Sequence, residues 1–69
     1  MSKEFCEFLE EAIKDEQKGK EYYNKLAETF KESDNPGVRV LAILAEKLAQ
    51  DEEGHRTTLI KVSRLVCSR

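Results

Sequence analysis

The sequence predicts an all-α fold in which an antiparallel helical hairpin dimerises into a four-helix bundle. A single turn signal, SDNPG at residues 33–37, divides the chain. Apolar residues spaced three and four apart lie on both sides of it, and together they form a face too wide for two helices to cover. Because 69 residues make at most one small domain, residues 1–69 are expected to form a single helical unit.

The first helix is expected over about residues 3–33. Ser2 is a suitable N-cap, and Glu4 lies in the first turn, where the helix dipole favours an acidic side chain. The apolar stripe of this helix advances in steps of four and three through Phe5, Leu9, Ala12, Glu16, Gly19, Tyr23, Leu26 and Phe30. Such spacing is typical of a helix packed in a bundle.

The second helix is expected over about residues 36–67. A residue before proline is pushed out of the α region, and proline suits the first helical position, so Asn35 is the expected N-cap. Arg64 and Arg69 lie near the other dipole end. The stripe continues through Val38, Leu41, Ala45, Leu48, Glu52, His55, Leu59, Val62 and Val66. Further apolar residues widen both stripes, so we expect a second copy of the chain to cover them.

Composition excludes several classes of protein. The net charge is −2, with basic residues spread along the chain, which gives no reason to expect nucleic acid as a partner. No run approaches the ~18 apolar residues of a transmembrane helix, so we expect no membrane partner. The acidic start, MSKEFCEFLEE, does not resemble a signal peptide, and a cytoplasmic location is expected.

Three polar residues interrupt the apolar stripes. Of the 12 basic and 14 acidic residues, only Glu16 and Glu52 fall on a stripe, and the single histidine, His55, joins them. If the chain reverses near Asn35, Glu16 comes level with Glu52 and His55, which lie one turn apart on one face. All three are common metal ligands.

Burial of these carboxylates requires compensation. An unpaired buried carboxylate costs several kcal/mol or becomes protonated. A two-fold dimer would gather four carboxylates and two imidazoles, and two divalent cations would neutralise them. Mixed carboxylate and imidazole ligands suit iron or manganese better than calcium or structural zinc. The alternative is a metal-free polar network that sets the helix register.

The sequence resembles the ferritin-like di-iron carboxylate proteins, and the rubrerythrin branch in particular. Their ligand pattern is a Glu on one helix and Glu-x-x-His on the next, supplied twice per site. Glu16 matches the first, and Glu52-Glu53-Gly54-His55 matches the second. The likeness covers nearly the whole chain but only half of the usual four-helix domain. It therefore implies a half-domain that completes its site by homodimerisation or higher assembly.

The resemblance also implies roles for individual residues. Glu52 of both copies would bridge two iron ions per dimer, with manganese or a mixed pair as alternatives, and Glu16 and His55 would be terminal ligands. Asp51 matches an aspartate that supports a histidine of the opposing helix, although a surface role is equally consistent. Tyr23 matches a tyrosine common near these sites, with core packing as the simpler reading. Glu53 is expected to point to solvent.

Two glycines and two cysteines complete the candidates. Gly19 is unfavourable in a helix interior and is expected to make room beside the site, for close helix approach or a small oxidant. Gly54 has this role or none. Cys6 and Cys67 are most simply free thiols. Because reflection about Asn35 brings them within about one turn, or ~5 Å, a disulfide is the alternative.

The resemblance implies an oxidase or peroxidase activity, in which Fe(II) is oxidised by oxygen or peroxide, or peroxide is reduced. These 69 residues hold no cysteine-rich electron-transfer domain such as complete rubrerythrins carry, so a separate electron donor is expected. The alternatives are a non-catalytic, metal-stabilised helical module, an iron-storage component and, last, a metal-free adaptor.

Overall fold

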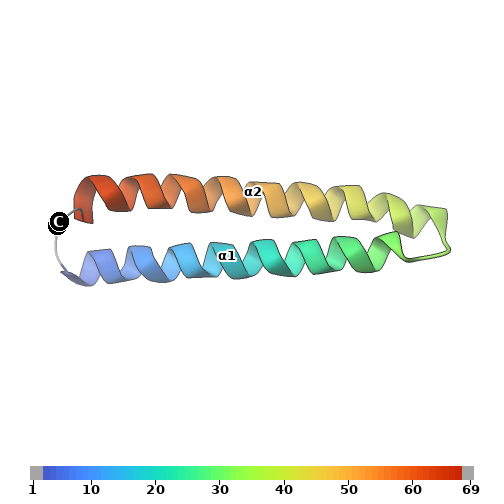
Figure 1. Ribbon diagram of the computed structural model, residues 1–69, viewed down its shortest axis with the longest axis horizontal. Coiled ribbons are helices and arrows are strands. Elements are labelled where there is room, and N and C mark those ends of the chain that lie inside the picture. The colour runs from blue at the N-terminus through green and yellow to red at the C-terminus, as the bar shows by residue number, and fades with distance from the viewer. Residues whose placement is uncertain (1–2, 68–69) are drawn as a thin grey trace.

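Two antiparallel helices make up the computed structural model, which describes residues 3–67 (Figure 1). Helix α1 spans Lys3–Lys31 and helix α2 spans Pro36–Cys67, and residues 3–67 contain no strand. The helices lie side by side, with the turn at one end of the hairpin and the start of α1 and the end of α2 at the other. The expected helical hairpin is therefore confirmed. The proposed roles of Ser2 and Arg69 lie outside the described residues.

The turn forms because Asn35 caps α2. Its side-chain Oδ1 accepts hydrogen bonds from the backbone N–H of Gly37 at 2.8 Å and of Val38 at 3.4 Å. These are donors that the first turn of a helix leaves without an intrahelical partner. Helix α1 ends at Lys31, earlier than the expected residue 33, because the Ser33 N–H bonds to the carbonyl of Phe30 and its hydroxyl accepts the Asn35 N–H.

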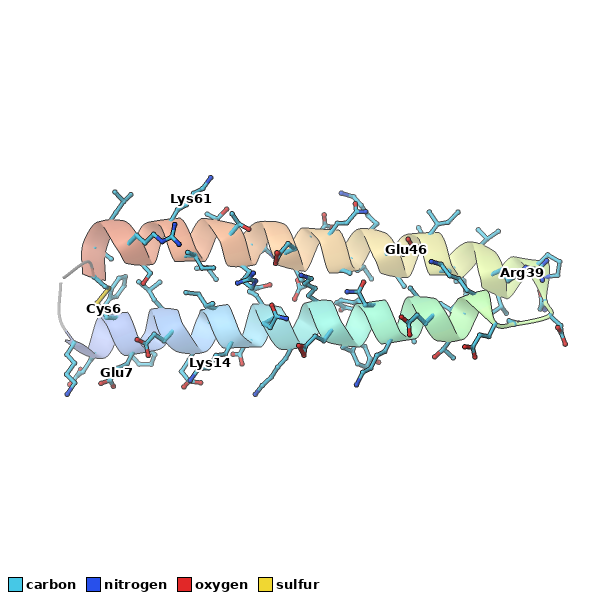
Figure 2. The ribbon with its side chains drawn as sticks, in the orientation of Figure 1. Cys6, Glu7, Lys14, Arg39, Glu46 and Lys61 are labelled. Atoms are coloured by element: carbon cyan, nitrogen blue, oxygen red, sulfur yellow. A yellow bond between two sulfur atoms is a disulfide. The ribbon has the colours of Figure 1, made fainter. Side chains whose placement is uncertain are left out.

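The core of the hairpin is thin. The buried apolar residues are Leu9, Ala27, Ala42, Ala45 and Ala49. Small side chains along α2 let α1 approach closely, so the contact holds little apolar volume. Charged side chains such as Glu7, Lys14 and Lys61 point away from the opposite helix (Figure 2).

Much apolar surface remains uncovered. The hairpin measures 51 × 14 × 13 Å, and its radius of gyration is 15.8 Å, against about 11 Å for a compact chain of this length. It exposes 5335 Å² of surface, whereas a compact protein of 8.0 kDa exposes about 4450 Å². The large apolar residues at the surface are Phe5, Phe8, Tyr22, Val40, Leu41, Ile43, Leu44, Leu48 and Leu65.

A disulfide between Cys6 and Cys67 closes the open end of the hairpin (Figure 2). The Cα atoms are 6.0 Å apart, within the usual range for a disulfide. The structure thus contains the alternative bond rather than two free thiols. Disulfides persist in oxidising compartments and in the cells of hyperthermophiles, and they are rare in the cytoplasm of other organisms. The bond therefore argues against the expected cytoplasmic location unless the host is a hyperthermophile.

The helices do not resemble membrane spans. Within residues 3–67, neither helix has an apolar stretch long enough to cross a bilayer.

The disulfide should stabilise the hairpin. It joins residues 61 positions apart, and such a bond contributes about 2–4 kcal/mol by restricting the unfolded chain. Reduction should therefore lower the melting temperature, at fixed protein concentration, by roughly 10–30 °C. Circular dichroism with and without reductant measures this, and a Cys6→Ser/Cys67→Ser variant should not respond to reductant. Two free thiols per chain in unreduced, denatured protein would contradict the bond.

Candidate metal centre

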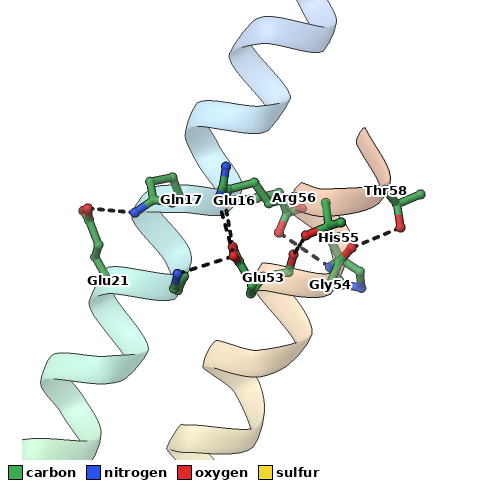
Figure 3. A network of polar contacts seen from close by, with 10 residues as sticks. Glu16, Gln17, Glu21, Glu53, Gly54, His55, Arg56 and Thr58 are labelled. Carbon is green, nitrogen blue, oxygen red and sulfur yellow. Dashed lines mark hydrogen bonds and ion pairs between the residues drawn. The ribbon is translucent and has the colours of Figure 1, made fainter. Parts of the chain in front are cut away.

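Glu16 of α1 lies opposite His55 of α2 (Figure 3), and Glu52 of α2 joins them in one cluster. His55 Nδ1 is 3.5 Å from Glu16 Oε2 and 3.6 Å from Glu52 Oε1. One ligand atom from each residue lies within 4.8 Å of the others, close enough to hold a metal ion. The structure therefore brings together the three residues that the sequence singled out as metal ligands.

The cluster follows from the position of the turn. Glu16 precedes Asn35 by nineteen residues, and Glu52 and His55 lie on either side of the position nineteen residues after it. The spacing of three between Glu52 and His55 places both on one face of α2, one turn apart. A turn shifted by several residues would have separated the carboxylates along the helix axis, at 1.5 Å per residue.

The two carboxylates are largely withdrawn from water. The Glu16 side chain is 24% exposed and that of Glu52 is 26% exposed. Among the described residues neither carboxylate pairs with a lysine or arginine, and both contact His55. Glu16 Oε2 is fully buried and accepts no hydrogen bond within the described chain. Such an atom is costly to bury, which makes it a good candidate for a cation ligand.

The pKa of Glu52 is raised above its usual value of 4.5. The main cause is partial loss of water around the carboxyl group, followed by the Glu16 carboxyl group beside it, and His55 opposes both. The metal-free protein therefore resists ionisation of Glu52. A cation between Glu16 and Glu52 would offset the repulsion between their two carboxylates.

His55 differs from the sequence-based expectation. Its side chain is 62% exposed, although its place on the apolar stripe predicted a core position. The stripe faces the edge of the two-helix contact, where α1 alone cannot cover an imidazole. Leu41 and Leu48, on the same stripe of α2, are 42% and 44% exposed for the same reason.

The sequence predicted that Glu53 points to solvent, but in the structure its carboxylate contacts side chains of both helices. Its Oε1 accepts a hydrogen bond from Arg56 Nε at 2.8 Å, and its Oε2 lies 3.5 Å from Lys20 Nζ of α1 (Figure 3). The Arg56 hydrogen bond is the main cause of a lowered Glu53 pKa, and the same bond raises the pKa of Arg56. Glu53 thus connects the helices beside the candidate ligands. The spacing of Glu53 and Arg56 was a visible sign of this pair, but the contact with Lys20 was missed.

Asp51 and Tyr23 occupy less informative positions. Asp51 Oδ1 accepts a hydrogen bond from Lys47 Nζ at 2.9 Å, one turn earlier on α2. The Tyr23 ring packs edge-to-face against Tyr22, with ring centroids 5.4 Å apart. Support of a histidine by Asp51 and a redox role for Tyr23 stay predictions.

The two neighbouring glutamates should respond to pH in opposite directions. Because the folded-state pKa of Glu52 is raised, its contribution to stability is present below pH 4.5 and lost as the pH rises through the folded-state pKa. Because the folded-state pKa of Glu53 is lowered, its contribution is present above pH 4.5 and lost as the pH falls. Melting temperatures of the metal-free parent, Glu52→Gln and Glu53→Gln proteins should be measured at pH values on both sides of 4.5. As the pH rises, the melting temperature of the parent should fall relative to that of Glu52→Gln and rise relative to that of Glu53→Gln. Parallel curves for the parent and Glu52→Gln would contradict the electrostatic account of the cluster.

One comparison with known proteins identifies a family for this chain. The model of the Rubrerythrin family matches residues 7–66, a range that contains Glu16, Glu52 and His55. No curated protein and no solved structure gave a significant match to the chain. Since the family match covers far more than half of the 69 residues, the chain belongs to the rubrerythrin family.

Proposed function

We propose that this protein is a di-iron oxidoreductase of the ferroxidase or peroxidase type, whose site is completed by two copies of the chain. Membership in the rubrerythrin family implies iron binding. The observation that carries the proposal is the cluster of Glu16, Glu52 and His55, whose ligand atoms lie within 4.8 Å of one another.

The residues present fit an iron site. Two carboxylates and one imidazole are the mixed oxygen and nitrogen donors that suit iron or manganese. Glu16 Oε2 is a buried acceptor that accepts no hydrogen bond within the described chain, so a cation there would satisfy it. Neither carboxylate has a lysine or arginine partner in residues 3–67 to compete with a metal.

A second copy of the chain is the expected occupant of the open face. On α2 the exposed residues Leu41 and Leu48 lie on the stripe that continues into Glu52 and His55, and the exposed Leu44 lies beside it. The surface exposed beyond that of a compact chain is similar to the ~800 Å² that each partner contributes to a standard interface. Dimerisation would cover these leucines and bring a second set of ligands to the first.

Each residue of the cluster has a distinct expected part. Glu52 of both copies would bridge the metals, while Glu16 and His55 would each complete one end. Because the pKa of the Glu52 carboxyl group is raised in the metal-free protein, protons would compete with iron for this carboxylate, and iron binding should strengthen as pH rises. The leucines beside the cluster would limit the access of water once a second copy covers them.

Iron bound in this way would supply the electrons that reduce oxygen or peroxide. The protein's part is to hold the ligands, balance their charge and exclude water. A separate electron donor would restore the reduced state between turnovers of a peroxidase, whereas an Fe(II) oxidase takes its electrons from the iron it consumes.

Fe(II) titration with simultaneous measurement of oxygen or peroxide consumption tests the activity. Parent protein should consume the oxidant faster than Fe(II) alone does. Glu52→Ala should be the most damaging change, because a symmetric dimer loses both bridging carboxylates. Loss of a residue that only orients a metal ligand weakens metal binding by about 10–100-fold. Glu16→Ala and His55→Ala remove ligands themselves, so they should weaken iron binding by more than this.

Glu28→Ala is the matched control for these variants. Glu28 is exposed on the same helix as Glu16, twelve residues or about 18 Å further along, so its loss should leave binding and turnover unchanged. Iron binding without oxidant consumption would indicate the metal-stabilised module instead. Parent-like binding by Glu52→Ala would show that the ligand assignment is wrong.

A further inference from the structure

Gly19 lies where any side chain would collide with Glu52. A Cβ atom built on Gly19 overlaps the Glu52 Oε2 atom, and it lies 3.2 Å from Cδ and 3.4 Å from Cγ of the same side chain. The backbone gives no reason for a glycine here, because Gly19 is within α1 and no glycine in residues 3–67 has a positive φ. Glycine is among the least favourable residues in a helix interior. Its presence therefore calls for a reason outside the helix.

The neighbours of Gly19 and Glu52 hold this contact in place. Lys20, the next residue on α1, pairs with Glu53, the next residue on α2, at 3.5 Å. Arg56 binds the same Glu53 carboxylate from one turn further along α2. With Glu53 held toward Lys20, the Glu52 side chain extends across the position of Gly19.

We propose that Gly19 is a positioning residue for Glu52. The missing side chain leaves space in which the Glu52 carboxylate lies against α1, beside Glu16 and within reach of His55. A methyl group at this position displaces the carboxylate, which is the flexible end of its side chain, without preventing the helices from packing. The consequence for metal binding rests on the proposed function, whereas the contact with Glu52 does not.

Gly54 provides a matched control on the facing helix. It is also a glycine within a helix, two residues after Glu52, but a Cβ atom built on it meets nothing within 4 Å. Gly54→Ala should therefore show the gain in helix stability that follows from replacing glycine by alanine, with no effect on the ligands. That gain corresponds to a rise in melting temperature of about 4–8 °C for a domain of this size.

A double-mutant cycle in metal-free protein tests the contact between Gly19 and Glu52. In a Glu52→Ala background, Gly19→Ala should raise the melting temperature about as much as Gly54→Ala does. In the parent background, Gly19→Ala should raise it less or lower it, because the methyl group meets the carboxylate. The measurement uses calorimetry with a chelator at one protein concentration. Equal shifts in both backgrounds would overturn the proposal.

Titration with Co(II), followed by its visible absorption, tests the effect on the ligands. Gly19→Ala should bind Co(II) at least ~10-fold more weakly than the parent, as expected when the orientation of a ligand is lost, while Gly54→Ala binds it as the parent does. Parent-like binding and spectrum in Gly19→Ala would overturn the positioning role. Failure of the parent itself to bind Co(II) would count against the proposed function, and the double-mutant cycle would then decide the role of Gly19 alone.

Discussion

The carboxylates of Glu16 and Glu52, held together between the two helices, constrain much of this structure. Each is about three-quarters withdrawn from water, and neither pairs with a lysine or arginine in residues 3–67. Partial loss of water around Glu52, followed by the effect of the Glu16 carboxyl group beside it, raises the pKa of Glu52. On α1, Gly19 has no side chain at the position where one would collide with the Glu52 carboxylate. The cations of Lys20 and Arg56 lie close by, but they are directed to Glu53 and leave the cluster uncompensated. The arrangement is costly for a hairpin alone and well suited to a protein that binds cations.

The thin apolar core also indicates that the hairpin alone is an unfavourable arrangement. Alanines at positions 42, 45 and 49 bring the helices together, and Leu9 is the one large side chain that the described hairpin buries. Leu41 and Leu48, which are exposed on α2, share a stripe with Glu52 and His55, so the uncovered apolar surface and the surface that carries the candidate ligands are continuous. A second copy would add apolar contact and ligands in a single step, which couples stability to site assembly.

Sequence reasoning could predict the features that depend on spacing alone. Asn35 before Pro36 located the turn, and the distance of Glu16 from that turn set its level against Glu52 and His55. It could not predict features that depend on side-chain direction. Glu53 turned toward Lys20 rather than to solvent, and His55 lies at the open edge of its stripe. Spacing placed the two cysteines within about one turn of each other, but free thiols were the simpler prediction and the structure contains the disulfide instead.

The central claim is that two copies of this hairpin hold two metal ions between them. Native mass spectrometry of protein loaded anaerobically with Fe(II) measures subunit number and metal content in the same particle. The account predicts a dimer, or a multiple of it, that carries two iron ions per pair of chains. A folded monomer that retains iron, or a stable dimer that binds none, would contradict it.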